Sequence, residues 1–232
     1  ICAILCYIVC FKLTRERVEV PASSQKVSAS AIFKSIFTNR ALLGIIVAAI
    51  FVLLSQLTVM SLAGYVYPNV YGSAAAQSTA SLLGTVVMLI VCAPFASKLA
   101  AKFGKKELAV ASSICSALVW LVCLIWRPAS VWGFVACYIL ANIGMGFFNT
   151  IIWAMITDVI DDAEVRSGIR EDGTIYSVYS FARKLGQAFS SGLVGALLGI
   201  IGYTEATAFD PAVTRGIFNM ACIAPIIGFV CI

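Results

Sequence analysis

Histidine is absent from the sequence, and only 12% of its 232 residues are charged. An ordinary soluble domain has about 25% charged residues, so this composition argues against a soluble globular protein. Without histidine, the chain lacks the commonest metal ligand of proteins. It has nine cysteines but no CxxC pair, and most of the cysteines lie within apolar segments, where a free thiol behaves as a small hydrophobic group. We therefore expect no metal site, no cofactor and no disulfide framework.

Long apolar runs dominate what is present. Hydrophobic residues make up 61% of the chain, and its mean hydropathy is +1.00. Several runs reach the length of about 20 residues that a helix needs to cross a membrane. We therefore predict an all-α, polytopic helical membrane protein in contact with a lipid bilayer. The apolar segments are 1–11, 41–66, 79–97, 108–126, 130–157, 174–202 and 217–232.

The two terminal runs are short, and the chain starts without methionine. We interpret the sequence as an internal piece of a longer chain. Its parts would be the end of one span at 1–11, a central loop at 12–40, and a bundle at 41–232 whose last span is truncated. The loop at 12–40 is charged, is rich in serine and alanine, and contains Pro21, as expected of a hinge between two bundles.

Basic residues alternate between the linkers. Outside the pair Arg183 and Lys184, twelve of the fourteen cations lie in 12–40, 98–107 and 158–173. The positive-inside rule makes these three linkers cytoplasmic. The net charge of +5 is therefore explained by membrane topology, and we expect no nucleic acid partner.

The segment 174–202 carries a polar stripe at helical spacing, with Arg183 at its edge. The stripe consists of Ser177, Ser180, Lys184, Gln187 and Ser191. If the span starts at Thr174, Lys184 lies about 16 Å along the helix, near the middle of a hydrocarbon core of about 30 Å. A charge there normally faces a cavity or a carboxylate. Alternatively, the span runs from Leu185 to Tyr203, and both cations snorkel to the inner surface.

The segment 130–157 carries a second stripe. Its members are Asn142, Gly146, Asn149, Trp153 and Thr157. Interhelical packing explains such a pattern, because glycine allows close approach and asparagine bonds across helices. The alternative is a cavity wall in which Asn149 binds a polyol and Trp153 stacks on its ring.

The linker 158–173 crowds six acidic residues against Arg166 and Arg170. Three interpretations are open. The cluster is a solvated loop, a latch that pairs with cations of another bundle, or a metal-diphosphate site such as membrane prenyltransferases have. The last interpretation requires a second acid-rich linker, and the sequence offers none.

One long motif, starting at Trp153, reads WAMITDVIDDAEVRSGIREDGTIYSVYSFARKLGQA. It resembles the signature between spans ten and eleven of the glycoside–pentoside–hexuronide:cation symporters, the melibiose-permease-like branch of the major facilitator superfamily. Two further stretches are similar to family segments. They are SIFTNRALL, before span seven, and PFASKLAAKFGKKE, between spans eight and nine. The resemblance implies the second six-helix bundle of a twelve-helix transporter, whose N-terminal half would be the partner of this chain.

The resemblance also implies roles for single residues. The lysine matching Lys184 lies close to the cation site, and the positions matching Trp153, Tyr179 and Ser180 face the sugar. Melibiose permease has an amide at the position of Tyr179 and an aliphatic residue at that of Arg183. We expect Arg183 to contact the substrate and to affect substrate preference.

A cytoplasmic gate is implied as well. In the family it comprises the acids matching Asp158, Asp161 and Glu164, with the arginine matching Arg170. We expect these acids to pair with cations of the N-terminal half when the cytoplasmic side is closed.

The expected function is symport of a glycoside, pentoside or hexuronide with Na⁺ or H⁺, by alternating access of two bundles. The protein would not be an enzyme, and it would be a multi-pass protein of the plasma membrane, in particular a bacterial inner membrane. Two alternatives stay open at this point. One is a related transporter of a lipid or other amphiphile, and the other is a membrane enzyme that uses the acidic linker for metal-diphosphate chemistry.

Overall fold

The computed structural model describes residues 2–14, 39–167 and 172–232, and these residues form helices and no strand. The chain divides into two compact units, residues 1–35 and 36–232. In the first unit, helix α1 (Cys2–Leu13) covers the predicted apolar segment 1–11. Most of the expected loop at 12–40 lies outside the described residues.

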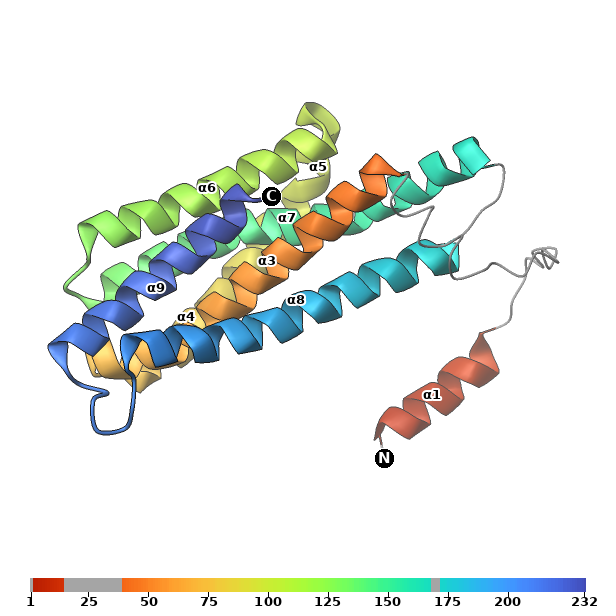
Figure 1. Ribbon diagram of the computed structural model, residues 1–232. Helices are drawn as coiled ribbons and strands as arrows, with labels where there is room; N and C mark the ends of the chain where they lie inside the picture. Colours follow the sequence, from red (N-terminus) through yellow and green to blue (C-terminus); the bar gives the residue numbers. More distant parts are fainter. Residues whose placement is uncertain (1, 15–38, 168–171) are drawn as a thin grey trace. The chain divides into compact units, whose positions relative to one another are not determined.

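The second unit is a bundle of long helices (Figure 1). Six helical stretches among the described residues are long and apolar enough to cross a membrane, which confirms the predicted all-α membrane fold. The first span is α3 (Arg40–Tyr65), which continues as a π-helical turn over Val66–Val70. The second is α4 (Ala74–Val87), a π-helical turn (Met88–Cys92) and α5 (Ala93–Phe103). The others are α6 (Lys105–Trp126), α7 (Val131–Ser167), α8 (Asp172–Ile201) and α9 (Pro211–Val230).

Two predicted boundaries were wrong. The last helix begins at Pro211, not at 217, because Asp210 is extended and proline suits the first helical position. With 20 residues α9 is long and apolar enough to cross a membrane. Helix α7 also continues ten residues past 157, so the acidic residues from Asp158 to Glu164 lie on a helix rather than in a loop.

Small and hydroxylated residues let the helices pack closely. Gly186 of α8 lies against the backbone of Ile50 in α3, where a Cβ would come within 3.0 Å of the Ile50 carbonyl oxygen. Four residues further along α8, the Ser190 hydroxyl lies 3.2 Å from the Thr58 hydroxyl of α3. Such contacts are typical of helix association in membranes, where apolar surface alone gives little drive between helices.

The π-helical turn over Met88–Cys92 precedes Pro94. Proline has no N–H to donate to the preceding turn, and its ring disfavours regular α-helix there, so the wider turn relieves the clash. Cys92 within it donates from Sγ to the carbonyl of Ile143 in α7, at 3.3 Å. Gly146 of α7 faces the same thiol, and a Cβ on Gly146 would collide with it.

The basic residues of the bundle are segregated along its length. Lys105, at the start of α6, contacts the C-terminal part of α7. Arg127 and Arg215 line one hollow between the α6–α7 connection and the start of α9. Since α6 runs from Lys105 to Trp126, these groups lie at opposite ends of that helix, as the alternating charge of the linkers predicts.

Candidate functional site

Helix α8 has two different faces. One face is buried inside the bundle and packs on α3. Its residues are Ile175, Tyr179, Ala182, Gly186, Ser190, Val194 and Leu198. The predicted polar stripe lies on the other side, where Ser177, Ser180, Lys184 and Ser191 are exposed. Within the described residues of the second unit, no helix covers the polar side of α8.

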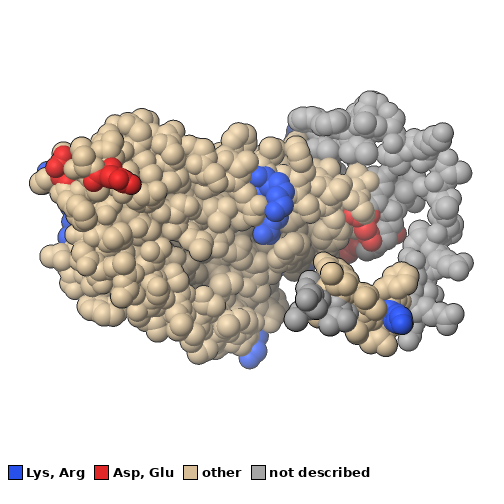
Figure 2. Space-filling model, turned by 90° about the horizontal axis from the view of Figure 1, so that it is seen from below, with Lys and Arg blue, Asp and Glu red and all other residues tan. Residues whose placement is uncertain are grey.

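Lys184 lies near the middle of α8. The helix starts at Asp172, so Lys184 is about 18 Å along it at the usual rise per residue. The Lys184 ammonium donates to Gln187 Oε1 at 3.1 Å. No carboxylate in the described part of the chain forms an ion pair with it. Figure 2 shows the surface from the side of α8, where a small basic patch lies within a broad uncharged area.

Arg183 turns toward two aromatic rings. Its guanidinium carbon lies 5.4 Å from the ring centre of Trp153 in α7 and 5.7 Å from that of Tyr179 in α8. A guanidinium nitrogen of Arg183 donates to the Tyr179 hydroxyl at 3.4 Å. The two rings meet edge to face, with centres 5.6 Å apart. These three residues, from two helices, form one cluster that we call the Arg183 cluster.

The two rings of the Arg183 cluster differ in exposure. Trp153 is 49% exposed, whereas Tyr179 is 2% exposed. Trp153 can therefore present a ring face to a ligand, while in this structure Tyr179 supports Arg183 from behind. Ser180 is exposed next to the cluster, and Asn149, one turn before Trp153, is half-buried.

The stripe predicted on 130–157 divides into two parts. Gly146 packs against the π-helical turn, and the Asn142 side chain donates to the Tyr138 carbonyl of its own helix. Further along, Trp153 is exposed and belongs to the Arg183 cluster. Close packing therefore holds at Gly146, whereas the Asn142 bond stays within its own helix and Trp153 is exposed.

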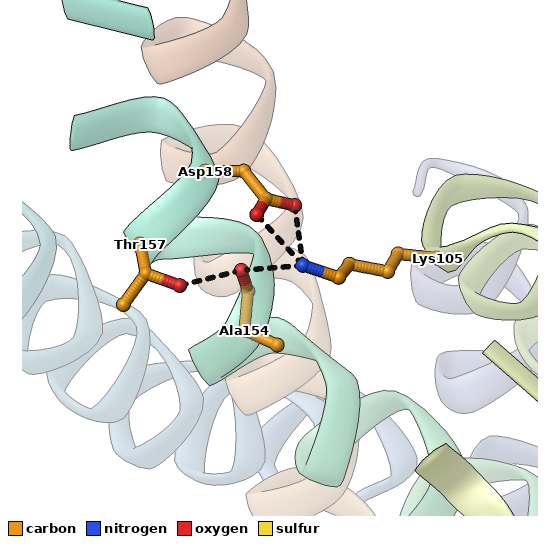
Figure 3. Close-up of polar contacts among 4 residues, drawn as sticks. All are labelled: Lys105, Ala154, Thr157 and Asp158. Atoms are coloured by element: carbon orange, nitrogen blue, oxygen red, sulfur yellow. Dashed lines mark hydrogen bonds and ion pairs between the residues drawn. The ribbon is translucent and has the colours of Figure 1, made fainter. Parts of the chain in front are cut away.

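The expected gate residues lie further along α7 and begin five residues after Trp153. Asp158 pairs with Lys105, whose ammonium lies 2.7 Å from both carboxylate oxygens and 3.3 Å from the Ala154 carbonyl (Figure 3). Gly104 is the single residue between α5 and α6, and its φ of +97° is a backbone conformation that favours glycine. The turn at Gly104 places Lys105 at the start of α6, next to Asp158. Asp161 and Glu164 follow on α7, and Arg170 lies outside the described residues.

Sequence reasoning missed the contacts of Asp158 and those of Arg183. The partner of Asp158 was expected in another bundle, but in this structure it is Lys105 of the same bundle. No local pattern links two residues 53 positions apart. The Tyr179–Arg183 contact could have been anticipated, since residues four apart are neighbours on a helix.

The profile of the MFS/sugar transport protein family matches residues 1–232. The chain is 27% identical over 228 residues to the glucuronide carrier protein homolog of Escherichia coli, covering 97% of this chain and 49% of that protein. It is 32% identical over 202 residues to an uncharacterized symporter of Bacillus subtilis, covering 85% and 43%. It is also 32% identical over 124 residues to a putative 2,3-dihydroxypropane-1-sulfonate exporter of Escherichia coli, covering 53% and 27%. The chain thus spans about half the length of the first two relatives.

Proposed function

We propose that this chain serves in transport. The premise is that it belongs to the MFS/sugar transport protein family. The family match and the carrier and symporter relatives confirm the resemblance to the glycoside–pentoside–hexuronide:cation symporters. They identify a transporter and not an enzyme, which removes the metal-diphosphate alternative. Six candidate spans make it a multi-pass membrane protein, and its bacterial relatives agree with a bacterial inner membrane.

Within that family we propose cation-coupled symport of a glycoside, pentoside or hexuronide by alternating access. The chain supplies one bundle, and a second bundle covers the polar side of α8. The observation that carries the proposal is Lys184, a charge near the middle of a membrane-length helix, on a face that this half leaves uncovered. A charge at that depth is costly unless it faces a cavity or an opposite charge.

In this scheme Lys184 neutralises carboxylates of the other half while the cation site is empty. An ammonium is a compact charge on a flexible stem, so it can withdraw when Na⁺ or H⁺ arrives. The exposed Trp153 ring stacks on the sugar, and Asn149 and Ser180 hydrogen-bond to its hydroxyl groups. Rocking of the two bundles then opens this site to each side of the membrane in turn.

The direction of transport has a second candidate. One relative is named as a putative exporter of a small sulfonate. An exporter would use the same site but would release its substrate on the outer side.

The test uses the full-length transporter in proteoliposomes with a set of radiolabelled glycosides, pentosides and hexuronides. Uptake is measured with an inward Na⁺ gradient, with an inward H⁺ gradient and with neither. We expect one gradient to drive accumulation of at least one sugar, and Lys184→Ala to abolish accumulation while exchange across equilibrated membranes persists. Arg215→Gln, near the start of α9, also removes one positive charge and should leave accumulation intact. Accumulation by Lys184→Ala at the unmutated rate would contradict the coupling role. Gradient-driven efflux of preloaded substrate without any accumulation would favour the exporter.

A further inference from the structure

We propose that Arg183 binds an acidic group of the substrate, so that the transported sugar carries a carboxylate or a sulfonate. This proposal rests on the proposed transport function and deepens it, because it names the chemical class of the ligand. It is carried by the geometry of the Arg183 cluster and by the unused hydrogen-bonding capacity of its guanidinium.

The guanidinium is oriented but largely unsatisfied. Two rings lie within cation–π distance of it, and they restrict its plane without using its N–H groups. Arginine carries five N–H donors, and one of them is used within the described part of the chain, in the contact with the Tyr179 hydroxyl. Four donors therefore have no protein partner there. Carboxylates and sulfonates, with two or more acceptor oxygens on one centre, match such a fork of donors.

The charge on Arg183 also needs an anion. No carboxylate among the described residues forms an ion pair with Arg183. The nearest acidic residue of α8 in the sequence is Asp172, about 16 Å away along the helix axis. Lys184 is the adjacent residue and has the same sign, so it raises the local positive potential.

The two cations of α8 have separate surroundings, which suits them to separate anions. Lys184 extends to Gln187 along the polar stripe, while Arg183 turns to Trp153 and Tyr179. In the proposed transporter, Lys184 serves the carboxylates of the cation site and Arg183 serves the substrate. The guanidinium lies over the Trp153 ring and about half of the Trp153 surface is exposed, so one ligand can contact the indole and place its acidic group on Arg183.

Equilibrium binding to the purified full-length transporter tests this, without any ion gradient. Two matched pairs of probes differ only at the group under test. The first pair is 4-nitrophenyl β-D-glucuronide and 4-nitrophenyl β-D-glucoside, and the second is 6-deoxy-6-sulfo-D-glucose and D-glucose. The variants are Arg183→Gln, which removes the charge, and Arg183→Lys, which keeps the charge but loses the planar fork. Arg215→Gln serves as the control for charge removal elsewhere.

We expect the unmutated protein to bind the acidic member of at least one pair at least tenfold more tightly than the neutral member. Arg183→Gln should weaken acidic binding roughly 10- to 100-fold, or about 1.4–2.8 kcal/mol, and leave neutral binding nearly unchanged. Arg183→Lys should fall between the two. The pair that shows the preference tells carboxylate from sulfonate.

Equal binding of acidic and neutral probes, or an undiminished preference in Arg183→Gln, would overturn the proposal. The second outcome would mean that Arg183 pairs with a carboxylate of the other bundle. If Arg183→Gln does not fold, an undiminished preference in Arg183→Lys overturns the proposed fork. Binding without a gradient says nothing about coupling, so the proposed symport can fail in proteoliposomes while this inference stands, and the reverse also holds.

Discussion

The buried and exposed faces of α8 differ in their residues and in the partners of those residues, although they alternate along the same 30 residues. The buried face finds its partners inside this chain, since Gly186 contacts the α3 backbone and Ser190 lies against Thr58. The exposed face carries Lys184 and hydroxyl groups whose hydrogen bonds stay within α8. The first face holds the bundle together. The second is suited to contact a partner outside this bundle. Two pairs of substitutions on α8 test this contrast, and a third experiment compares it with an ion pair between α6 and α7.

The largest effect is expected at Gly186. Replacing it with leucine forces a side chain against the Ile50 backbone and the Leu53 Cβ, which would each lie within 3.3 Å of the new Cβ. Overpacking of this kind costs about 1–3 kcal/mol and occasionally more, so Gly186→Leu should lower the temperature of unfolding of the purified transporter by several degrees. Gly192→Leu is the matched control, because nothing lies within 4 Å of a Cβ there. Equal loss of stability in both variants would mean that the two faces do not differ in packing.

A smaller effect is expected at two adjacent serines. Ser190 is buried and bonds to Thr58 across the α3–α8 interface, whereas Ser191 is exposed and donates to the Gln187 carbonyl of its own helix. Ser190→Ala should cost about 0.5–1.5 kcal/mol, because it leaves the Thr58 hydroxyl buried with a lost partner. Ser191→Ala should change the free energy of unfolding by a few tenths of a kcal/mol at most. Denaturation of both variants in the same detergent measures the difference, and the opposite order would contradict the assignment of faces.

The smallest effect on stability is expected at the Lys105–Asp158 pair. The two side chains are 39% and 55% exposed, so their ion pair should contribute about 0–1 kcal/mol. A double-mutant cycle with Lys105→Gln and Asp158→Asn measures that energy.

If Asp158 and Asp161 form the cytoplasmic gate, neutralising both should slow accumulation and leave substrate binding measurable. Normal accumulation by the double variant would indicate that these acids take no part in gating.

Most of the helices could be predicted from hydropathy, but their ends could not. Apolar composition stops near Thr157, while the backbone of α7 continues to Ser167, because a helix that leaves the membrane no longer needs apolar side chains. The start of α9 was missed although Asp210 and Pro211 carry a start signal, since Arg215 lowers the local hydropathy.

The candidate site was predictable by residue and not by contact. Helical spacing placed Lys184 on the polar stripe and Arg183 at its edge, and both positions agree with the structure. The contact between Trp153 and Arg183 joins two helices, and the Lys105–Asp158 pair joins a tight turn to a distant helix. Such contacts depend on how the helices cross, which the spacing of residues within one helix does not contain.

The π-helical turn before Pro94 has a mechanical consequence. Because proline cannot donate to the preceding turn, the backbone between α4 and α5 has fewer hydrogen bonds to resist bending than the helix on either side of it. Cys92 contacts Ile143 and Gly146 of α7, so this weakly hydrogen-bonded turn is held against α7. Bending at this turn would move α5, with Lys98 and Lys102, relative to α4, which would stay packed on α7. The second span thus consists of two helical segments that can bend relative to each other at a point about midway along its length.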